Sequence, residues 1–303
     1  MKLLIAGSFE LNEERRSVLE DMGYEIFLSQ REDTELGEFV QDIDAVICNW
    51  LFVNHDINRF SSLKCIQLLS AGLDRVPLDH IKEKNIRLYN ARGVYSIPMA
   101  EFAVSGVLQL YKQSRFFYDN QKKQLWEKNR NIRELSRSRV CIVGAGSVGQ
   151  ETAKRFGAFT DDVIGVDLFP CDSPLFREVL PLDRLDEALE ASDIVILTLP
   201  LTDQTRGMFG SERFGRMKQD SIIVNIARGG IIDEKALEAA LNGHIYGAVL
   251  DVFAEEPLPS DSSLWQMENV IITPHNSFVS DMNGERMWNV IYNNLKEFIS
   301  ERK

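Results

Sequence analysis

The sequence predicts an α/β protein built from two doubly wound parallel sheets. Short apolar runs bounded by turn residues recur along the whole chain, and amphipathic stretches separate them. This alternation of strand-like and helix-like segments is typical of βαβ units, which form parallel sheets. A chain of 303 residues is long enough for two domains, each with its own core.

The first third of the chain contains five strand-like runs. In order, they are KLLIAG, YEIF, AVIC, CIQLLS and IRLYN. Between the first two runs, residues 12–22 have helical spacing, and Gly23 is a natural residue to end that helix. We expect these five strands to form one sheet.

A second set of strand-like runs begins in the middle of the chain. It comprises the six runs RVCIVG, DVIGVD, DIVILTLP, DSIIVNI, YGAVLDVF and NVIITPH. Residues 98–118 are expected to form a helix before the first of them, and residues 282–299 an amphipathic helix after the last. The polar stretch around Trp126 suits an exposed arm or a segment that docks on a partner.

Composition excludes several classes of function. Apolar residues make up 44% of the chain and charged residues 26%, as in ordinary globular proteins. A net charge of −12 argues against nucleic-acid or anionic-membrane partners, which need a basic face. The four cysteines (Cys48, Cys65, Cys141 and Cys171) form no paired motif, so we expect no disulfide and no metal site. No apolar run reaches membrane-spanning length, the amino terminus lacks the pattern of a secretory signal, and a cytoplasmic location is expected.

The motif GAGSVG, residues 144–149, directly follows the strand RVCIV and opens a helix-like stretch. In that context Gly144 allows a tight turn, Gly146 lets the backbone approach a pyrophosphate, and Gly149 permits close packing of helix on strand. The amides around Ser147 and Val148 would face the phosphates at the positive end of the helix dipole. The motif therefore predicts a dinucleotide site.

Asp167 ends the next strand-like run, where a carboxylate can accept hydrogen bonds from both hydroxyls of the adenosine ribose. It would also repel a 2′-phosphate. No Arg or Lys occurs in the following segment DLFPCDSPLF. The sequence therefore predicts NAD(H) as cofactor in preference to NADP(H).

Three ionisable side chains follow separate strands of the second set. Arg228 comes after SIIVNIA, Glu256 after AVLDVFAE, and His275 after NVIITP. Taken alone, the arginine would be a solvated end cap and the histidine a structural residue. The carboxyl ends of parallel strands meet at one edge of a sheet, where doubly wound proteins bind ligands, so we expect the three to converge there.

The ordered set GAGSVG with Asp167, NIARGGIID, AVLDVFAEEPLP and ITPHNS, together with SAGLDRV near residue 70, resembles the D-isomer-specific 2-hydroxyacid dehydrogenase family. The resemblance covers nearly the whole chain. It implies a flavodoxin-like substrate-binding domain (1–97), a Rossmann NAD-binding domain (98–278) and a last helix (279–303) that returns to the first domain. The implied reaction is hydride transfer between nicotinamide and a small D-2-hydroxy acid or 2-keto acid, of the glyoxylate, hydroxypyruvate or 3-phosphoglycerate type.

The resemblance also implies roles for individual residues. Arg228 would hold the keto acid, because a guanidinium fork can engage both carboxylate and carbonyl. His275 would protonate the carbonyl oxygen, and Glu256 would orient the imidazole and favour its protonated form. Glu256 is chosen over Glu255 because the family glutamate immediately precedes the proline. Further implied contacts are Pro200, Thr205, Ala227 and Asp251 for the cofactor, and Ala71, Gly72 and Trp50 for the substrate.

Some questions stay open at this level. Arg75 or Arg92 could bind a substrate phosphate, but both could equally be surface charges. Members of the family usually dimerise through the cofactor domain, so the resemblance implies a homodimer. The alternative function is a dinucleotide-sensing, corepressor-like binding protein on the same fold. After His275, Asn-Ser-Phe departs from the small apolar pair of many relatives, so the residues around the imidazole are expected to differ from theirs.

Overall fold

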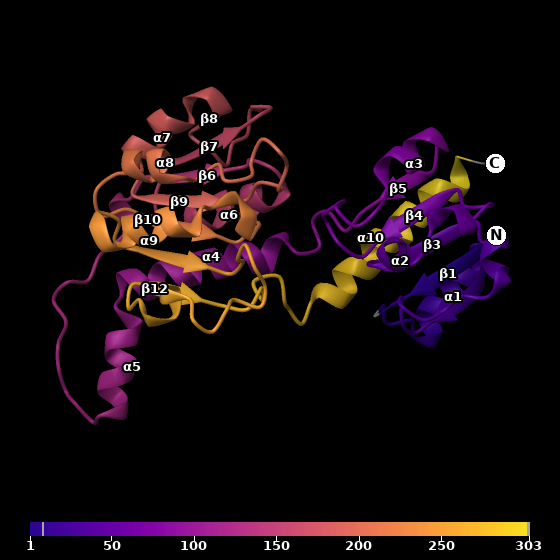
Figure 1. Ribbon diagram of the computed structural model, residues 1–303, viewed down its shortest axis with the longest axis horizontal. Coiled ribbons are helices and arrows are strands. Elements are labelled where there is room, and N and C mark those ends of the chain that lie inside the picture. Colours follow the sequence, from indigo (N-terminus) through magenta and orange to yellow (C-terminus); the bar gives the residue numbers. More distant parts are fainter. Residues whose placement is uncertain (8, 302–303) are drawn as a thin grey trace. The chain divides into compact units, whose positions relative to one another are not determined.

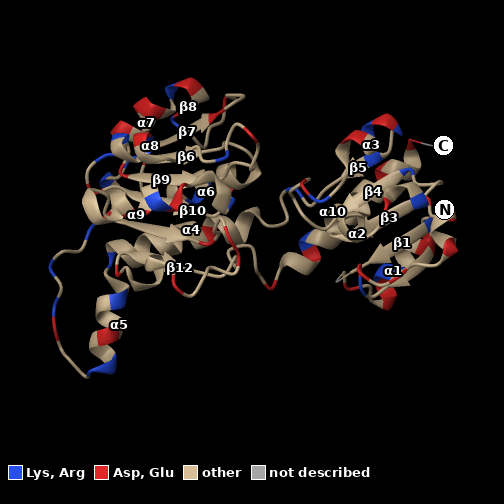
Figure 2. Ribbon diagram, in the orientation of Figure 1, with Lys and Arg blue, Asp and Glu red and all other residues tan. Residues whose placement is uncertain are grey.

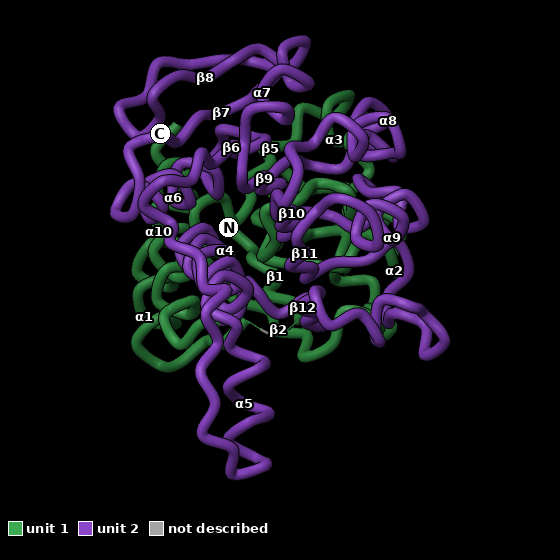
Figure 3. The backbone as a smooth tube through the Cα atoms, turned by 90° about the vertical axis from the view of Figure 1, so that its left-hand side faces the viewer, with its two compact units in different colours: residues 1–95, 280–303 green, residues 96–279 purple. Residues whose placement is uncertain are grey.

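The chain divides into two compact units. A computed structural model of the protein describes residues 1–7 and 9–301. Unit 1 combines residues 1–95 with residues 280–303, and unit 2 comprises residues 96–279 (Figure 3). The carboxyl-terminal segment thus packs with the amino-terminal part of the chain.

Unit 1 is built on a five-stranded parallel sheet in the order β2-β1-β3-β4-β5. The strands are β1 (Lys2–Ala6), β2 (Glu25–Ser29), β3 (Ala45–Cys48), β4 (Cys65–Leu68) and β5 (Arg87–Tyr89). The helices are α1 (Glu13–Asp21), α2 (Leu51–Asn54), α3 (Leu78–Glu83) and α10 (Asn283–Ser300), with 3-10 turns η1 (Glu38–Asp42) and η2 (Ile57–Arg59). All five predicted strands are present, and the strand order reverses at β1, which makes the sheet doubly wound.

Alternate residues of β1 face opposite sides of this sheet and join different apolar clusters. Leu4 packs on the side that contains Val46 and Ile66. Leu3 packs on the other side with α1 and with α10, whose buried residues are Met287, Ile291, Leu295 and Phe298. The spacing of those four residues forms one stripe along the helix, which explains why α10 belongs to unit 1.

Unit 2 contains a seven-stranded parallel sheet in the order β12-β11-β10-β9-β6-β7-β8. The strands are β6 (Val140–Val143), β7 (Val163–Asp167), β8 (Glu178–Pro181), β9 (Ile194–Leu197), β10 (Ile222–Asn225), β11 (Gly247–Leu250) and β12 (Val270–Ile272). The prediction of six strands was wrong by one, because it omitted β8. This edge strand has only two apolar residues between an exposed glutamate and a proline, which is too weak a pattern to detect.

The helices of unit 2 cover both faces of that sheet (Figure 1). They are α4 (Ser96–Tyr111), α5 (Ser114–Lys122), α6 (Ser147–Phe156), α7 (Leu185–Ala191), α8 (Ser211–Arg216) and α9 (Glu234–Gly243), with 3-10 turns η3 (Leu135–Arg137), η4 (Leu182–Arg184), η5 (Gly229–Ile231) and η6 (Ser263–Gln266). The single helix predicted for residues 98–118 is in fact α4 and α5. Gln113 separates them in a left-handed conformation, with φ 55°. Its side-chain amide donates hydrogen bonds to the Leu110 carbonyl and the Tyr246 hydroxyl.

Beyond α5 the chain is exposed until it returns to the body of unit 2. In Figures 1 and 3, α5 projects away from the sheet. Trp126 is 99% exposed, and Arg133 brings the segment back by donating its backbone N–H to the Tyr111 carbonyl (3.0 Å). We call residues 114–134 the arm. Its first part is the helix α5, and the polar stretch around Trp126, which the sequence predicted as an exposed arm or a docking segment, follows that helix.

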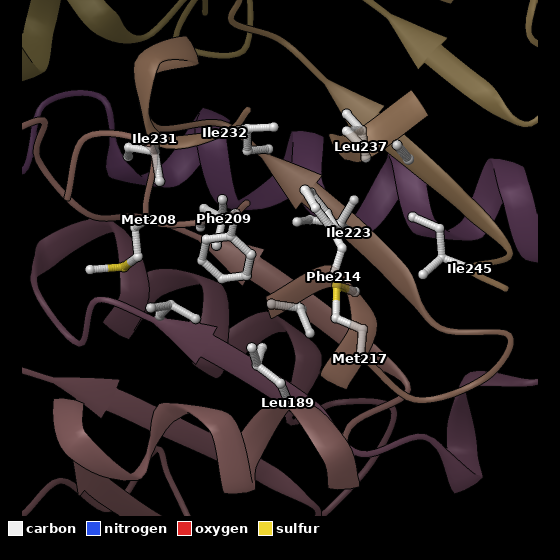
Figure 4. Packing of buried hydrophobic residues seen from close by; sticks show 14 of the residues in the cluster. Leu189, Met208, Phe209, Phe214, Met217, Ile223, Ile231, Ile232, Leu237 and Ile245 are labelled. Carbon is white, nitrogen blue, oxygen red and sulfur yellow. The ribbon is translucent and has the colours of Figure 1, made fainter. Parts of the chain in front are cut away.

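The core of unit 2 lies on both faces of its sheet. Figure 4 shows Phe209, Met217 and Leu237 gathered against Ile223 of β10. Charged residues lie mainly on helices and loops, and the strands are almost free of them (Figure 2). Cys48, Cys65 and Cys141 are buried, Cys171 is exposed, and all four are free thiols. Among the described residues, none of the helices combines the length and apolarity needed to cross a bilayer.

Candidate active site

The glycine-rich loop connects β6 to α6 at the carboxyl edge of the seven-stranded sheet. Gly144 has φ +107°, which an L-residue rarely adopts. A Cβ on Gly149 would lie 2.0 Å from the Gly144 carbonyl oxygen, so only glycine lets α6 begin this close to the loop. A Cβ on Gly146 would meet nothing within 4 Å. The middle glycine therefore faces open space, as a loop that receives a pyrophosphate requires.

Asp167, the last residue of β7, closes one side of this loop. Its Oδ2 accepts the Ala145 N–H (2.7 Å) and its Oδ1 accepts the Phe169 N–H (2.9 Å). The carboxylate is thus oriented beside the glycine loop, where it can also accept from ribose hydroxyls. The open glycine, the start of α6 and this acid together fit an adenine dinucleotide.

The first residue of α6 is linked to the start of α4. The hydroxyl oxygens of Ser147 and Ser96 lie 2.8 Å apart, and Ser96 is buried. Val148 packs on the core at the same helix start. These contacts fix the helix end whose amides were predicted to face the phosphates.

The remaining predicted cofactor residues of the β9 and β10 loops lie on the same edge of the sheet. Thr205 is buried, and its hydroxyl donates to the Pro200 carbonyl (2.8 Å) while accepting the Thr202 N–H (2.8 Å). Pro200 is exposed and Ala227 is buried. Thr205 therefore shapes the loop from within, and Pro200 presents the surface.

His275 and Glu256 are in direct contact. His275 Nδ1 lies 2.8 Å from Glu256 Oε2, and both side chains are 38% exposed. The other carboxylate oxygen, Oε1, accepts the Phe253 N–H (3.0 Å). The acid is thus oriented by its own loop and in turn orients the imidazole, which leaves Nε2 as the nitrogen that can exchange a proton with a ligand. The Phe278 ring packs edge-on against the imidazole at 5.9 Å between centroids.

The backbone at His275 is held in a left-handed conformation, with φ 51°. Its N–H donates to the Asp251 carbonyl (2.8 Å). The fully buried Asp251 carboxylate accepts the Thr273 hydroxyl (2.6 Å), the Asn276 N–H (2.7 Å) and the Ser277 N–H (3.0 Å). The Asp251 carboxylate therefore holds the histidine loop in place.

Arg228 follows β10, one strand away from the Glu256 loop. Its backbone carbonyl accepts the Asn225 side-chain amide (3.1 Å), and its Nη1 donates to the Ala227 carbonyl (2.8 Å). A Cβ on the next residue, Gly229, would lie 1.8 Å from the Phe253 carbonyl carbon. The arginine loop thus packs directly on the peptide that leads to Glu256.

Sequence reasoning missed one residue of this network. Glu234, at the start of α9, accepts the Ala254 N–H through Oε1 (2.8 Å). Two carboxylates therefore hold consecutive amides of one loop, Glu256 at Phe253 and Glu234 at Ala254. The only signal in the sequence was a pair of acids, Asp233 and Glu234, which is also the ordinary pattern of a helix start.

The predicted substrate residues lie in unit 1, at the carboxyl edge of its sheet. Trp50 follows β3 and is 46% exposed, and the exposed Ala71 and half-buried Gly72 follow β4. The Arg75 guanidinium lies 3.7 Å from the centre of the Trp50 ring. Arg92 is exposed beyond β5. These residues share one sheet edge, since β4 lies between β3 and β5.

Comparison with known proteins agrees with this geometry. Residues 104–277 match the family described as "D-isomer specific 2-hydroxyacid dehydrogenase, NAD binding domain". The chain is 35% identical over 280 residues to D-3-phosphoglycerate dehydrogenase of Methanocaldococcus jannaschii, covering 91% of this chain and 53% of that longer protein. It is 35% identical over 258 residues to hydroxypyruvate reductase of Thermotoga maritima, covering 83% of each.

A solved structure gives the same result. The D-isomer specific 2-hydroxyacid dehydrogenase of Xanthobacter autotrophicus Py2, in complex with NADPH and MES, aligns with a TM-score of 0.80 and 26% identity over 100% of this chain and 95% of that one. The corepressor-like alternative receives no support from these comparisons. The chain belongs to the D-isomer specific 2-hydroxyacid dehydrogenase family of oxidoreductases, as the matched domain, the two parallel sheets and the dinucleotide-binding type of glycine loop establish.

Proposed function

We propose that the protein interconverts small 2-keto acids and D-2-hydroxy acids, with His275 as the proton donor and acceptor. The observation that carries this proposal is the 2.8 Å contact between His275 Nδ1 and Glu256 Oε2, on the same sheet edge as the glycine loop. When bound, the nicotinamide supplies or accepts the hydride at the carbon that carries the oxygen. Nε2 of His275 gives a proton to that oxygen during reduction and removes it during oxidation.

Arg228 and Glu256 act around this proton transfer. The Arg228 guanidinium binds the substrate carboxylate and stabilises negative charge that develops on the carbonyl oxygen. Glu256 holds the imidazole with Nδ1 toward the carboxylate, which leaves Nε2 to exchange the proton with the substrate. Ten residues complete the proposed site by contacting the cofactor. They are Gly144, Gly146, Ser147, Val148, Gly149, Asp167, Pro200, Thr205, Ala227 and Asp251.

We assign substrate binding to residues 1–97 and cofactor binding to residues 98–278, with residues 279–303 returning to the first domain. The match of residues 104–277 to an NAD binding domain supports the second assignment. In the substrate domain, Ala71 and Gly72 would present backbone amides to the substrate carboxylate, and Trp50 would line the pocket. Gly72 is the stronger candidate because close approach to a ligand favours a residue without a side chain.

The deciding experiment measures NADH oxidation with a panel of 2-keto acids. The panel contains glyoxylate, hydroxypyruvate, pyruvate and 3-phosphohydroxypyruvate, and the reverse reaction is tested with the D- and L-hydroxy acids. We expect turnover with at least one keto acid and oxidation of the D-isomer alone. The names of the relatives from M. jannaschii and T. maritima make hydroxypyruvate and 3-phosphohydroxypyruvate the first candidates. Tight NADH binding without any turnover would contradict the proposal.

We further propose that NADH is preferred over NADPH. The support is the placement of Asp167 beside the glycine loop, where its charge would repel a 2′-phosphate, and the absence of Arg and Lys from residues 168–176. The ratio of kcat/KM for the two cofactors tests this. We expect a clear NADH preference that Asp167→Ala narrows. An NADPH preference in the unchanged protein would refute the proposed NADH preference. Such a result must be tested for, because the Xanthobacter relative was crystallised in complex with NADPH.

A homodimer formed through unit 2 is the assembly we propose. The arm projects from the sheet with Trp126 at 99% and Tyr118 at 57% exposure. Beside α5, a groove of 1360 Å³ is lined by residues that include Tyr118, Trp265 and Ile271. Light scattering at micromolar concentration should give twice the 34.6 kDa mass of the chain. Trp126→Ser should weaken the dimer, whereas Phe169→Ser, which removes a 78% exposed aromatic ring elsewhere, should not. A monomeric mass for the unchanged protein would contradict the dimer.

A further inference from the structure

The peptide at Ala145, inside the glycine loop, is held from both sides. Its N–H donates to Asp167 Oδ2 (2.7 Å), and its carbonyl accepts the side-chain amide of Gln150 through Nε2 (3.1 Å). Gln150 lies on α6, directly after the last glycine of the motif. The orientation of this peptide therefore depends on two side chains that come from different elements, β7 and α6.

The oxygen of the same Gln150 amide contacts the segment that follows Asp167. Its Oε1 accepts the Ser173 hydroxyl (2.8 Å). Because only the amide nitrogen can donate to a carbonyl, the two contacts also fix which way the amide group is turned. The Ser173 carbonyl accepts the N–H of Phe176 (3.2 Å), whose ring is buried in the core of unit 2. Gln150 thus joins the glycine loop to an anchored point beyond Asp167.

Residues 168–172 form the loop between Asp167 and Ser173, and all five are exposed. At its start, Asp167 Oδ1 accepts the Phe169 N–H (2.9 Å), and at its end Ser173 donates to Gln150. In the part of the chain that the structure describes, residues 170–172 make no hydrogen bond of their own. The conformation of this loop therefore depends on its two ends, and Gln150 holds one of them.

We infer that Gln150 is a positioning residue for the cofactor. Through Ala145 and Ser173 it orders the loop of residues 168–172 against the glycine loop, and it thereby sets the affinity for the adenosine half of NAD(H). The inference rests on the proposed function, which assigns the adenosine ribose to Asp167, the residue between the two loops. A loop that is already ordered loses little conformational entropy when a ligand binds, so more of the interaction free energy remains as affinity.

The test measures the binding of NADH and of AMP, which carries only the adenosine half of the cofactor. NADH is titrated by its fluorescence, and AMP by its displacement of NADH. Gln150→Leu removes both hydrogen bonds at similar side-chain size and should weaken AMP binding about fivefold to thirtyfold. The same factor is expected for NADH, because the change acts on the half that the two ligands share. At saturating NADH, kcat should change by less than about twofold.

Further variants separate this role from a general effect on folding. Ser173→Ala removes one of the two hydrogen bonds and should weaken AMP binding about twofold to tenfold, whereas Ser173→Thr keeps the hydroxyl and should restore the affinity. Lys154→Ala, at an exposed position on the same helix, is the matched control and should change neither affinity. Hydrogen exchange of the unliganded protein is an independent measurement. The backbone N–H groups within residues 168–172 should exchange faster in Gln150→Leu than in the control.

Three results would overturn the inference. The first is an AMP affinity that Gln150→Leu leaves unchanged, even if the melting temperature falls, since Gln150 would then act on folding alone. The second is a loss of NADH affinity more than about tenfold larger than the loss of AMP affinity, which would assign the effect to the pyrophosphate and nicotinamide half. The third is unchanged hydrogen exchange within residues 168–172.

Failure of the proposed reaction would have a different signature. In that case no 2-keto acid is turned over, but AMP still displaces NADH from the unchanged protein, and the displacement measured with Gln150→Leu decides the role of Gln150 without any substrate. An unchanged protein that binds neither ligand would remove the cofactor site and this inference with it.

Discussion

The carboxyl edges of the two sheets hold their polar side chains in different ways. In unit 2, charged groups are joined to one another and to backbone amides, as in the contacts of Glu256 with His275 and Phe253. In unit 1, the Glu32 carboxylate also accepts backbone amides, at Asn49 and Trp50, but Arg75 stacks on the Trp50 indole and donates to the Asn49 side chain. A proton-transfer pair requires fixed geometry, whereas a recognition surface can change one side chain at a time. We propose that unit 2 sets the reaction and that unit 1 sets the choice of substrate.

The largest expected effect comes from removing the His275 imidazole, which tests whether unit 2 sets the reaction. His275→Asn should lower kcat by about a hundredfold to ten-thousandfold, because the reacting oxygen loses its positioned acid. Asparagine is chosen because it tolerates the left-handed backbone at φ 51° better than alanine. Single-turnover oxidation of bound NADH measures the effect, and NADH affinity serves as the control. A fall in kcat of less than about tenfold would remove His275 from the mechanism.

A pair of glycine variants sharpens the distinction between folding and cofactor binding within unit 2. Gly149→Ala places a methyl group 2.0 Å from the Gly144 carbonyl oxygen and should cost at least about 1–3 kcal/mol of stability. Gly146→Ala meets nothing within 4 Å and should leave the melting temperature nearly unchanged, while it weakens NADH binding. Thermal unfolding and NADH fluorescence titration measure the two effects. Equal melting temperatures for both variants would contradict the loop geometry.

The Glu234 carboxylate, at the start of α9, tests whether the Glu256 loop at the unit 2 edge depends on a hydrogen bond from another element. Glu234→Ala removes the acceptor of the Ala254 N–H and should lower kcat about tenfold through displacement of the Glu256 loop, with little change in NADH affinity. Glu234→Gln keeps an acceptor oxygen and should restore most of the rate. Glu238→Ala, on the same helix, is the matched control and should have no effect. If Gln fails to restore the rate, the hydrogen bond is not the cause.

The smallest predicted effect concerns the opposite edge of the unit 1 sheet. Asp44 accepts the Lys2 N–H (2.9 Å) and pairs with the Lys64 ammonium. Burial acts to raise the pKa of Asp44, but these two donors together lower it below its ordinary 3.8. The ionised form therefore stabilises the fold above that ordinary value, and the contribution is lost as pH falls through the lowered value. Asp44→Asn should cost about 1 kcal/mol near pH 7.

Urea unfolding at several pH values measures that difference. The two proteins should converge in stability as pH falls through the lowered pKa of Asp44 and its carboxylate becomes protonated. Activity toward 2-keto acids at neutral pH should not change, because this edge lies at the other ends of the strands from Trp50 and Gly72. A constant difference at every pH would mean that the ion pair contributes nothing.

Much of the fold followed from the sequence because buried parallel strands carry an apolar signal of their own. Every strand of unit 1 and all but one of unit 2 have that signal, and β8 lacks it because it lies half-exposed at the sheet edge. The break between α4 and α5 escaped prediction because Gln113, neither glycine nor proline, makes the turn and side-chain hydrogen bonds stabilise it.

In the site, residues at strand ends were easier to predict from the sequence than residues whose contacts form only when the chain folds. Arg228, Glu256 and His275 each follow an apolar run, so their convergence on one edge could be expected. Glu234 gave no such signal, because its importance depends on the Ala254 amide that it meets after folding. Pairings of this kind have no fixed spacing along a chain.

The arm has a practical consequence for handling the protein. Residues 123–128 are all exposed, and none of the arm's residues in this stretch belongs to an apolar cluster. A protease could cut there without opening either core. If the proposed homodimer covers the arm, cleavage of this segment falls as protein concentration rises, and a trypsin digestion series then reports how much of a given preparation is dimeric.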